Sequence, residues 1–515
     1  MNDTDHNVAQ FLLEAKGDSR RALLTLKGDH SYGELRLASA DVAKYLIATG
    51  GHKGDRVILV GDNSFFWVAA YLGILQAGLV CVPLPPNISQ SDFDYIVGIT
   101  EAKFFFLQSG FAARDKHRFP DGGLVTDDGL PGKTGRLCLD LAELRVQVAD
   151  SEPPLPWTQT SDLAALMFTS GSTGKPRGVM VSHGNVKANT DSIIQYLQLT
   201  GEDRIMTVLP FHYCFGTSLL HTHLRVGGAL VLDHRFMYPE KVLQRIQETE
   251  CTGFAGVPSH YQILLRKAGL WKKSFPHLRY VQQAGGHLAP VFLRELREAL
   301  PTIQIFVMYG QTEATARLSY LPPDLLEEKL GSIGKGIPGV HLSVQNEAGE
   351  EVRPGEIGEI VAQGENVTRG YWRAPEETAG SFRGGKLFTG DLATVDEEGF
   401  IFIAGRTKDF LKCGGERISC KQLEQQLLEC EDLLEAAVIG VPDEMMGEAV
   451  KVFVVPRPGS AAVEERLRNF WKEHLPFQLV PREIVVLNIL PKNHAGKVMK
   501  EELRDTEAVG ISRGK

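Results

Sequence analysis

The sequence predicts an α/β protein with largely parallel sheets, and two observations support this fold class. Short apolar runs typical of strands recur along the chain, at 55–61, 103–108, 163–168, 204–210 and 303–309. Helical patterns lie between such runs, for example at 185–199 and 290–300. Strands that alternate with helices on this scale are joined by helical crossovers, which place them parallel in a sheet.

One long apolar stretch could be taken for a membrane span, but its details favour a buried helix followed by a buried strand. The segment from Phe65 to Leu84 is long and apolar enough to cross a bilayer. Gly78, however, fits the C-terminal cap of a helix, and the VCVPL segment after it is typical of a short strand. We therefore expect no membrane span.

The overall composition is that of an ordinary soluble enzyme. Of the 515 residues, 43% are hydrophobic and 23% are charged, and the chain is long enough for several domains. A net charge of -9 argues against nucleic acid as the main partner. Seven cysteines without a CxxC pair indicate a reducing compartment, and the polar, acidic N-terminus is unlike a signal peptide. We expect a cytoplasmic protein.

A domain boundary is expected in the segment GRTKDFLKCGGERIS, residues 405–419. The sequence before it, DEEGFIFIAG, is typical of a β-hairpin. The patterns after it, QLEQQLLE and VKVFVVP, indicate a compact α+β unit. We place the boundary at Lys408, which gives an N-terminal region of residues 1–407 and a C-terminal domain of residues 408–515.

The segment FTSGSTGKPRG, residues 168–178, follows an apolar strand and predicts a phosphate-binding loop. It is not a Walker motif, because only two residues separate Gly171 from the Gly174–Lys175 pair. Glycines let backbone N–H groups converge on an anion, and hydroxyl and lysine side chains add donors. These side-chain donors are Thr169, Ser170, Ser172, Thr173 and Lys175. A glycine-rich surface turn is the alternative.

The segment YGQTEAT, residues 309–315, directly follows a predicted strand and indicates part of a nucleotide site. Tyr309 can stack on a base, Thr312 can donate to a phosphate, and Glu313 can hold a magnesium ion. A Thr-Glu pair at the end of a strand is also a common helix cap, which is the alternative interpretation.

Five motifs occur in order along the chain and together point to one family. They are TSGSTGKPRG (169–178), YGQTE (309–313), FTGDLA (388–393), GRTKDFLKCGGE (405–416) and PKNHAGK (491–497). The set resembles the adenylate-forming superfamily, which contains acyl- and aryl-CoA synthetases, adenylation enzymes and luciferases. The resemblance implies a large N-terminal domain of layered α/β sheets with a distorted β-barrel, and a small, mobile α+β C-terminal domain.

The resemblance also implies an activity, that of an AMP-forming acid–thiol ligase. Such an enzyme uses ATP and Mg²⁺ to activate a carboxylic acid as an acyl-adenylate, and then transfers the acyl group to a thiol. No carrier domain is attached and no insertion parts the motifs from GSIG (331–334) to TGD (389–391), which favours coenzyme A as the acceptor. The alternatives are a stand-alone adenylation enzyme that loads the phosphopantetheine of a separate acyl or peptidyl carrier protein, and a non-catalytic nucleotide-binding relative. We expect a monomer or a homodimer.

By similarity, the residues that bind ATP come from several of these motifs. The β- and γ-phosphates would be held by Thr169, Ser170, Gly171, Ser172, Thr173, Gly174 and Lys175. Adenine would lie between Tyr309, with the adjoining Gly310 and Gln311, and the segment Ala284, Gly285, Gly286. Thr312 would contact the α-phosphate, and Glu313 would hold magnesium. Asp391 and Arg406 would bind the ribose hydroxyls, because a carboxylate can accept from both.

By similarity, the C-terminal domain supplies residues to both half-reactions. Lys497 would bridge the attacking carboxylate and the α-phosphate, where a fixed cation offsets the repulsion and stabilises the developing charge. A solvated surface lysine is the alternative. Lys408 is the expected hinge: one orientation delivers Lys497, and the other brings Gly414 and Gly415 to the path of the thiol.

The segment LPFHYCFGTS, residues 209–218, resembles the lining of the acid pocket in this superfamily. Its candidate residues are His212, Tyr213 and Cys214, together with Gly310. No acidic residue occurs from 204 to 232, which disfavours an α-amino acid because its buried ammonium would lack a partner. His212 would lie near the substrate carboxylate, and a hydrogen-bonded core histidine is the alternative. Aryl, fatty and hydroxy acids all remain open.

Overall fold

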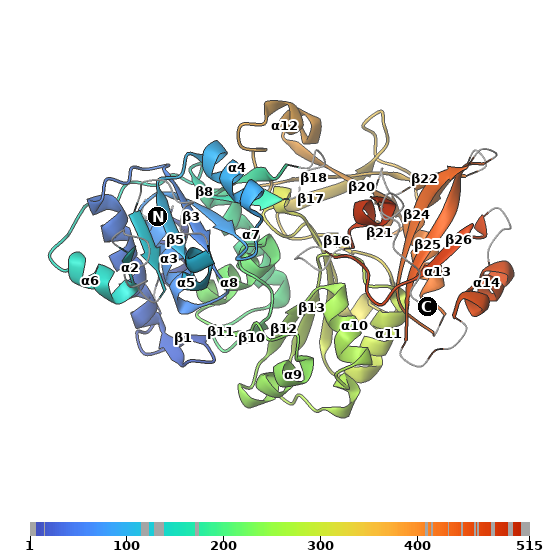
Figure 1. Cartoon of the computed structure of the whole chain (residues 1–515), viewed down its shortest axis with the longest axis horizontal. Coiled ribbons are helices and arrows are strands. Elements are labelled where there is room, and N and C mark those ends of the chain that lie inside the picture. Colours follow the sequence, from blue (N-terminus) through green and yellow to red (C-terminus); the bar gives the residue numbers. More distant parts are fainter. Residues whose placement is uncertain are drawn as a thin grey trace.

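The computed structural model in Figure 1 contains four β-sheets among the residues that it describes. Those residues are 7–14, 16–114, 123–127, 138–169, 175–406, 410–413, 416–430, 432–443, 446–457, 460, 463–474, 479–492 and 498–505. The sheet that contains β3 and β5 lies in the part of the molecule that holds the N-terminus. The sheet that contains β24, β25 and β26 belongs to a smaller C-terminal unit at the opposite end (Figure 1). The predicted mixed α/β architecture, with a large and a small part, is confirmed.

The first sheet has seven strands in the order β7–β6–β5–β3–β4–β8–β9. Their bounds are β3 Arg56–Val60, β4 Val80–Leu84, β5 Phe104–Leu107, β6 Gly123–Thr126, β7 Cys138–Leu139, β8 Leu163–Thr169 and β9 Arg177–Ser182. All neighbouring pairs are parallel except β8 and β9, which are antiparallel. The apolar runs 55–61, 103–108 and 163–168 form strands here, as predicted.

The second sheet has nine strands in the order β16–β15–β14–β13–β12–β10–β11–β1–β2. Their bounds are β1 Arg21–Leu24, β2 Asp29–Ser31, β10 Arg204–Thr207, β11 Ala229–Leu232, β12 Gly253–Gly256, β13 Tyr280–Gln283, β14 Gln304–Tyr309, β15 Ser319–Leu321 and β16 Lys335–Gly336. The strands from β14 to β1 are parallel, and antiparallel strands cover both edges. Strand β10 is shorter than the predicted 204–210, because the chain leaves the ladder before Pro210.

Helices form three layers around these two sheets. The layer between them contains α1 Val8–Leu13, α2 Tyr32–Ala48, α3 Phe65–Gln76, α6 Leu141–Gln147, α7 His183–Leu197 and α8 Cys214–Val226. Outside the first sheet lie α4 Gln90–Thr100 and α5 Ser109–Arg114. Outside the second lie α9 Pro239–Glu248, α10 Pro258–Arg266, η1 Leu270–Lys272 and α11 Pro290–Ala299. Parallel strands that are covered on both faces have continuous apolar sequences, which explains the short apolar runs in this sequence.

The apolar stretch Phe65–Leu84 folds as α3 followed by β4, as predicted. The Ser64 side chain caps the start of α3 by accepting from Trp67 N. Gly78, at φ +70°, ends the helix: its N–H donates to the Leu75 carbonyl, and the next N–H reaches back to Ile74. Within the part of the chain that the structure describes, no helix is long and apolar enough to cross a membrane.

Gly73 lets α2 and α3 approach each other closely. A Cβ atom at this position would lie 2.5 Å from Val42 Cβ and 2.6 Å from the Ser39 carbonyl oxygen. We expect Gly73→Ala to lower the free energy of unfolding by about 1–3 kcal/mol, measured by urea denaturation, because the added methyl overpacks this contact. Gly98→Ala is the matched control: its Cβ would meet no atom within 4 Å, so helix propensity should raise stability by about 0.5–1 kcal/mol. Equal effects of the two changes would contradict the packing argument.

The third sheet is antiparallel and partly curled, and it takes the place of the expected distorted barrel. Its strands are β17 Val340–Gln345, β18 Gly358–Gly364, β19 Phe382–Arg383, β20 Lys386–Val395 and β21 Ile401–Arg406. The predicted hairpin at DEEGFIFIAG is the β20–β21 pair, in which Asp391 lies opposite Arg406. The nearby short helices are η2 Thr312–Ala314, η3 Pro323–Leu325 and α12 Pro375–Ser381.

The C-terminal unit has its own sheet and its own core, as the predicted α+β pattern requires. Its strands are β22 Phe410–Cys413, β23 Glu416–Ser419, β24 Leu433–Asp443, β25 Gly447–Pro456 and β26 Glu483–Val486. Its helices are α13 Cys420–Leu427, α14 Val463–His474 and α15 Lys500–Asp505. Val452, Leu467 and Trp471 are fully buried in its core. The boundary proposed at Lys408 lies outside the described residues and stays a prediction.

Candidate active site

Three of the predicted nucleotide-binding residues meet where β14 ends beside the β20–β21 hairpin. The Tyr309 hydroxyl donates to Asp391 Oδ2 at 2.6 Å, and Arg406 Nε donates to Asp391 Oδ1 at 2.7 Å. Burial, followed by the Asp391 charge, raises the pKa of Tyr309 far above its ordinary value, so its proton stays on the phenol. Each carboxylate oxygen of Asp391 therefore accepts one protein hydrogen bond and retains a second lone pair for another donor.

These residues line a cavity of about 330 Å³ together with Gly285 and Gly286, which follow β13. Gly285 has φ +83°, and a Cβ atom on it would lie 2.9 Å from Val257 Cγ1. A side chain here would therefore be strained and crowded, which keeps this wall of the cavity flat. Ala284 is buried and is not among the residues that line the cavity.

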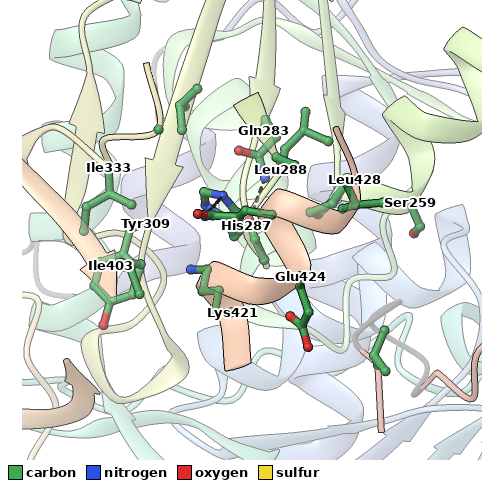
Figure 2. Close-up of a pocket in the computed structure, with 18 of the residues that line it drawn as sticks. Ser259, Gln283, His287, Leu288, Tyr309, Ile333, Ile403, Lys421, Glu424 and Leu428 are labelled. Carbon is green, nitrogen blue, oxygen red and sulfur yellow. Dashed lines mark hydrogen bonds between the residues drawn. The ribbon is translucent and has the colours of Figure 1, made fainter. Parts of the chain in front are cut away.

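Helix α13 of the C-terminal unit forms the opposite wall of this cavity (Figure 2). Lys421, Glu424 and Gln425 line it, and Gln425 Nε2 donates to His287 Nε2 at 2.5 Å. Burial, followed by the charge of Lys421, holds the pKa of His287 well below its ordinary value, so the neutral ring can accept. The sequence analysis did not anticipate this contact between the two parts of the chain.

A second, larger cleft of about 1070 Å³ joins the phosphate-binding and acid-binding candidates. His212, Tyr213, Cys214 and Gly310 all line it, as do Gln311, Thr312 and Glu313. A Cβ atom on Gly310 would lie 1.9 Å from the Ala316 carbonyl oxygen, so only glycine fits at this turn. The structure thus brings every predicted acid-pocket residue to the same cleft as the segment predicted to contact the α-phosphate.

Thr312 and Cys214 connect the two ends of this cleft. The Thr312 hydroxyl donates to Cys214 Sγ at 3.5 Å, across the gap between η2 and the start of α8. Burial raises the pKa of the Cys214 thiol, so the sulfur is neither a thiolate nor a nucleophile at neutral pH. Cys214 therefore lines the cleft without a reactive role.

Glu313 is held by a residue that the sequence analysis missed. The Tyr371 hydroxyl donates to Glu313 Oε1 at 2.8 Å, and the Arg177 guanidinium lies 4.7 Å from the centre of the Tyr371 ring. Within the described residues no group of three or more His, Cys, Asp or Glu side chains could hold a metal ion on its own. A single carboxylate suits magnesium that is completed by phosphate oxygens and water.

Among the described residues, four polar atoms of the cleft have no hydrogen-bond partner: Thr169 Oγ1, Arg177 Nε, His260 Nδ1 and Gln311 Nε2. Thr169 and Arg177 lie opposite each other at the ends of β8 and β9, so they flank the predicted phosphate loop. Buried donors without partners are uncommon in native proteins, and an anion with several acceptor oxygens would satisfy them. The residues present therefore fit a polyphosphate.

Comparison with known proteins settles the family. The AMP-binding enzyme family matches residues 13–372, and the AMP-binding enzyme C-terminal domain matches residues 422–497. This chain belongs to the AMP-binding enzymes. The adenylate-forming superfamily expected from the five motifs is confirmed, and with it the assignment as an enzyme.

Relatives of this AMP-binding enzyme match it along almost its whole length. A feruloyl-CoA synthase from Amycolatopsis is 32% identical over 92% of this chain and 93% of the relative. An oxalate–CoA ligase from Arabidopsis thaliana is 29% identical over 96% of this chain and 98% of the relative. The ATP-bound crystal structure of MatB from Rhodopseudomonas palustris shares 29% identity, with a TM-score of 0.85 over 98% of this chain and 99% of that one.

Several candidate residues of this AMP-binding enzyme lie outside the described residues. They are Ser170, Gly171, Ser172, Thr173, Gly174, Lys408, Gly414, Gly415 and Lys497. Lys175, at the edge of the phosphate loop, is described, and its ammonium lies 5.3 Å from the centre of the Tyr95 ring. It is not among the residues that line the cleft.

Two further residues of the cleft were also missed by sequence reasoning. His260 is half-buried on α10, and burial followed by the charge of Lys492 lowers its pKa to about 4. Lys492 lines both cavities and pairs with Glu435 at 2.6 Å. A single histidine or lysine outside a recognised motif gives no signal in one sequence, so neither could have been singled out.

Proposed function

We propose that this enzyme ligates a carboxylic acid to coenzyme A in two steps at the cleft described above. In the first, a carboxylate oxygen attacks the α-phosphorus of ATP and pyrophosphate leaves, which gives an acyl-adenylate. In the second, the sulfur of coenzyme A attacks the acyl carbon, the thiol proton is released and AMP leaves. The enzyme is an AMP-forming carboxylate–CoA ligase.

The observation that carries this proposal is the continuity of the cleft. Thr312 and Glu313 line the cleft together with the acid candidates, and Gly285, Gly310 and Arg406 line both this cleft and the adjoining cavity that contains Tyr309. An acid in the cleft and a nucleotide in the cavity would therefore meet at Thr312. Two reactants held in reacting geometry at one point lose most of the entropic barrier to reaction.

At the nucleotide end, Asp391 and Arg406 would bind the ribose, and Tyr309 would face adenine across from Gly285. The hydrogen bonds from Tyr309 and Arg406 fix the Asp391 carboxylate before the nucleotide arrives. A preformed acceptor loses less entropy on binding than a mobile one.

At the phosphate end, Glu313 would hold the magnesium ion, which would supply charge neutralisation for the polyphosphate. The hydrogen bond from Tyr371 fixes the orientation of the Glu313 carboxylate. Thr169, Arg177 and Gln311 would donate to phosphate oxygens, because they present unpartnered donors there. The loop from Ser170 to Lys175 would hold the β- and γ-phosphates, which leave as pyrophosphate.

The C-terminal unit would act in both steps by changing its orientation about Lys408. Lys497 would serve adenylation, and Gly414 and Gly415 would line the path of the thiol. Support comes from α13, which lines the proposed nucleotide cavity and contacts His287 through Gln425. His212 would lie near the reacting carboxylate.

The relatives differ in the acid that their names give: ferulate, oxalate and, for MenE of Bacillus subtilis, o-succinylbenzoate. They agree on coenzyme A. The acceptor proposed here is therefore coenzyme A. The names of the relatives do not identify the acid, which must be inferred from the residues that line the cleft.

The test is ATP–pyrophosphate exchange over a panel of short, aryl, fatty and hydroxy acids, followed by thioester formation. We expect at least one acid to support exchange and the same acid to form a thioester with coenzyme A. Thioester formation only with a carrier protein would replace coenzyme A as the acceptor. Exchange with no acid, while ATP still binds, would contradict the enzymatic proposal.

A further inference from the structure

Arg317 is a buried cation without a carboxylate partner, close to the acid end of the cleft. Its side chain follows η2 and is 2% exposed. Among the described residues no ion pair to it is recorded, and Nε and Nη2 have no hydrogen-bond partner. Burial lowers the pKa of Arg317, which reflects the cost of keeping this charge away from water.

The backbone and one side of the guanidinium are fixed by neighbours. The Arg317 carbonyl accepts from Asn189 Nδ2 at 3.2 Å and from Asn366 Nδ2 at 2.8 Å. The Tyr196 oxygen accepts a hydrogen bond from the guanidinium, and the Tyr196 hydroxyl in turn donates to Met308 Sδ at 3.1 Å. The unpartnered edge is therefore held in place by groups that are all neutral.

Two side chains of the cleft wall, those of Phe215 and Cys214, lie next to the Arg317 guanidinium. The Phe215 ring centre lies 4.0 Å from the Arg317 guanidinium carbon, and the Cys214 thiol lies within the electrostatic reach of its charge. Phe215 and Cys214 both line the cleft, and Cys214 contacts Thr312 at 3.5 Å. The cation thus stands directly behind the wall of the acid pocket, one side chain away from the point where the acid would react.

We propose that Arg317 binds a second carboxylate of the substrate, so that the acid is a short dicarboxylic acid. This rests on the ligase function proposed above. Nε and Nη2 form the edge of a guanidinium that holds both oxygens of a carboxylate in parallel hydrogen bonds. The Phe215 ring keeps its cation–π contact with the guanidinium carbon, and the substrate carboxylate binds at the Nε and Nη2 edge. An acid with an apolar tail would leave the charge buried and unpaired.

The spacing sets the size of the acid. Its reacting carboxylate lies at Thr312 and its second carboxylate at Arg317, with Cys214 beside the carbon chain between them. Thr312 contacts Cys214 and the Arg317 charge acts on the same cysteine, so we expect a short carbon chain between the two carboxylates. Malonate, succinate and glutarate are therefore the probes, and propionate, butyrate and pentanoate are their controls of matched length.

The first measurement uses the wild-type enzyme in ATP–pyrophosphate exchange. We expect the best dicarboxylate to exceed its matched monocarboxylate by about 100-fold or more in kcat/KM, because a site built for a polar group rejects the analogue that lacks it. Equal or better exchange with the monocarboxylates would overturn the proposal and leave the ligase function intact. Exchange with no acid of any class would instead contradict the ligase function itself.

The second measurement compares Arg317→Met with Arg225→Met. Arg225 is the matched control, because its guanidinium carbon also lies 4.0 Å from a phenylalanine ring centre, that of Phe11, and Phe11 does not line the cleft whereas Phe215 does. We expect R317M to lower the ratio of dicarboxylate to monocarboxylate kcat/KM by about 100-fold, and R225M to leave this ratio unchanged. A uniform loss for all acids in R317M would show that Arg317 only supports the fold.

The third measurement starts from the wild-type enzyme, so its main result does not depend on the folding of a variant. Succinate should raise the melting temperature of the wild-type enzyme, and butyrate at the same concentration should not, because only succinate pairs the buried charge. The shift should disappear in Arg317→Lys, which keeps the charge but loses the parallel pair of donors. No shift with any of the three dicarboxylates would overturn the proposal.

Discussion

Replacing Lys497 by alanine is expected to lower the rate of acyl-adenylate formation by about 100- to 1000-fold, because a fixed cation at the α-phosphate would be lost. The affinity for ATP should change little, since the proposed role concerns charge that develops only in the transition state. The measurement is pyrophosphate exchange with the best acid of the panel, with nucleotide binding followed separately by calorimetry.

The structure supplies a competing lysine as the control for this result. Lys492 and Val498 lie on either side of the segment that contains Lys497 and form an antiparallel β-bridge with each other. Both residues line the nucleotide cavity. Lys492 is neutralised by Glu435 at 2.6 Å, so Lys492→Ala should reduce exchange far less than Lys497→Ala. A large loss from Lys492→Ala together with a small loss from Lys497→Ala would transfer the proposed role to Lys492.

Replacing Asp391 by asparagine is expected to raise the KM for ATP by about 10- to 100-fold, because a hydrogen bond to a charged group contributes about 1.5–3 kcal/mol. Asparagine has one acceptor oxygen and one NH2 group, so it cannot accept from both Tyr309 and Arg406. The acceptors proposed for the ribose hydroxyls would therefore be lost or misaligned. Exchange kinetics at varied ATP and saturating acid measure the effect.

Asp396→Asn is the matched control for this change. Asp396 lies in the turn of the same β20–β21 hairpin and accepts from Lys329 Nζ at 3.1 Å. Its loss should lower stability without changing the KM for ATP. If D396N and D391N raise the KM equally, distortion of the hairpin explains both, and the direct role of Asp391 is contradicted.

The layered fold could be predicted because its central strands are covered on both faces. Strand β14 is apolar along nearly its whole length and ends at Tyr309, where polar residues begin. That change in composition marks the end of a parallel strand, where sites form in such sheets. The cleft residues Thr312 and Glu313 follow directly, so sequence order alone placed them beside the nucleotide candidates.

Contacts between distant segments could not be predicted in the same way. Tyr371 donates a hydrogen bond to Glu313, which lies 58 positions away in the sequence. From a single sequence, an aromatic residue is interpreted as part of the hydrophobic core. Arg317 reads as a solvated surface residue, because arginine is rarely buried without a partner. Its burial follows from the packing of α7 and α8 around it, which no local pattern encodes.

The position of Arg406 has a thermodynamic consequence. It is the last residue of β21, and the next described strand, β22, begins at Phe410 in the C-terminal unit. One residue therefore anchors the carboxylate proposed for the ribose and also begins the connection between the two parts of the chain. A nucleotide that favours one setting of Arg406 favours the orientation of the C-terminal unit coupled to that setting, by at most the difference in binding free energy. Linkage is reciprocal, so holding that unit in place would in turn tune the affinity for nucleotide.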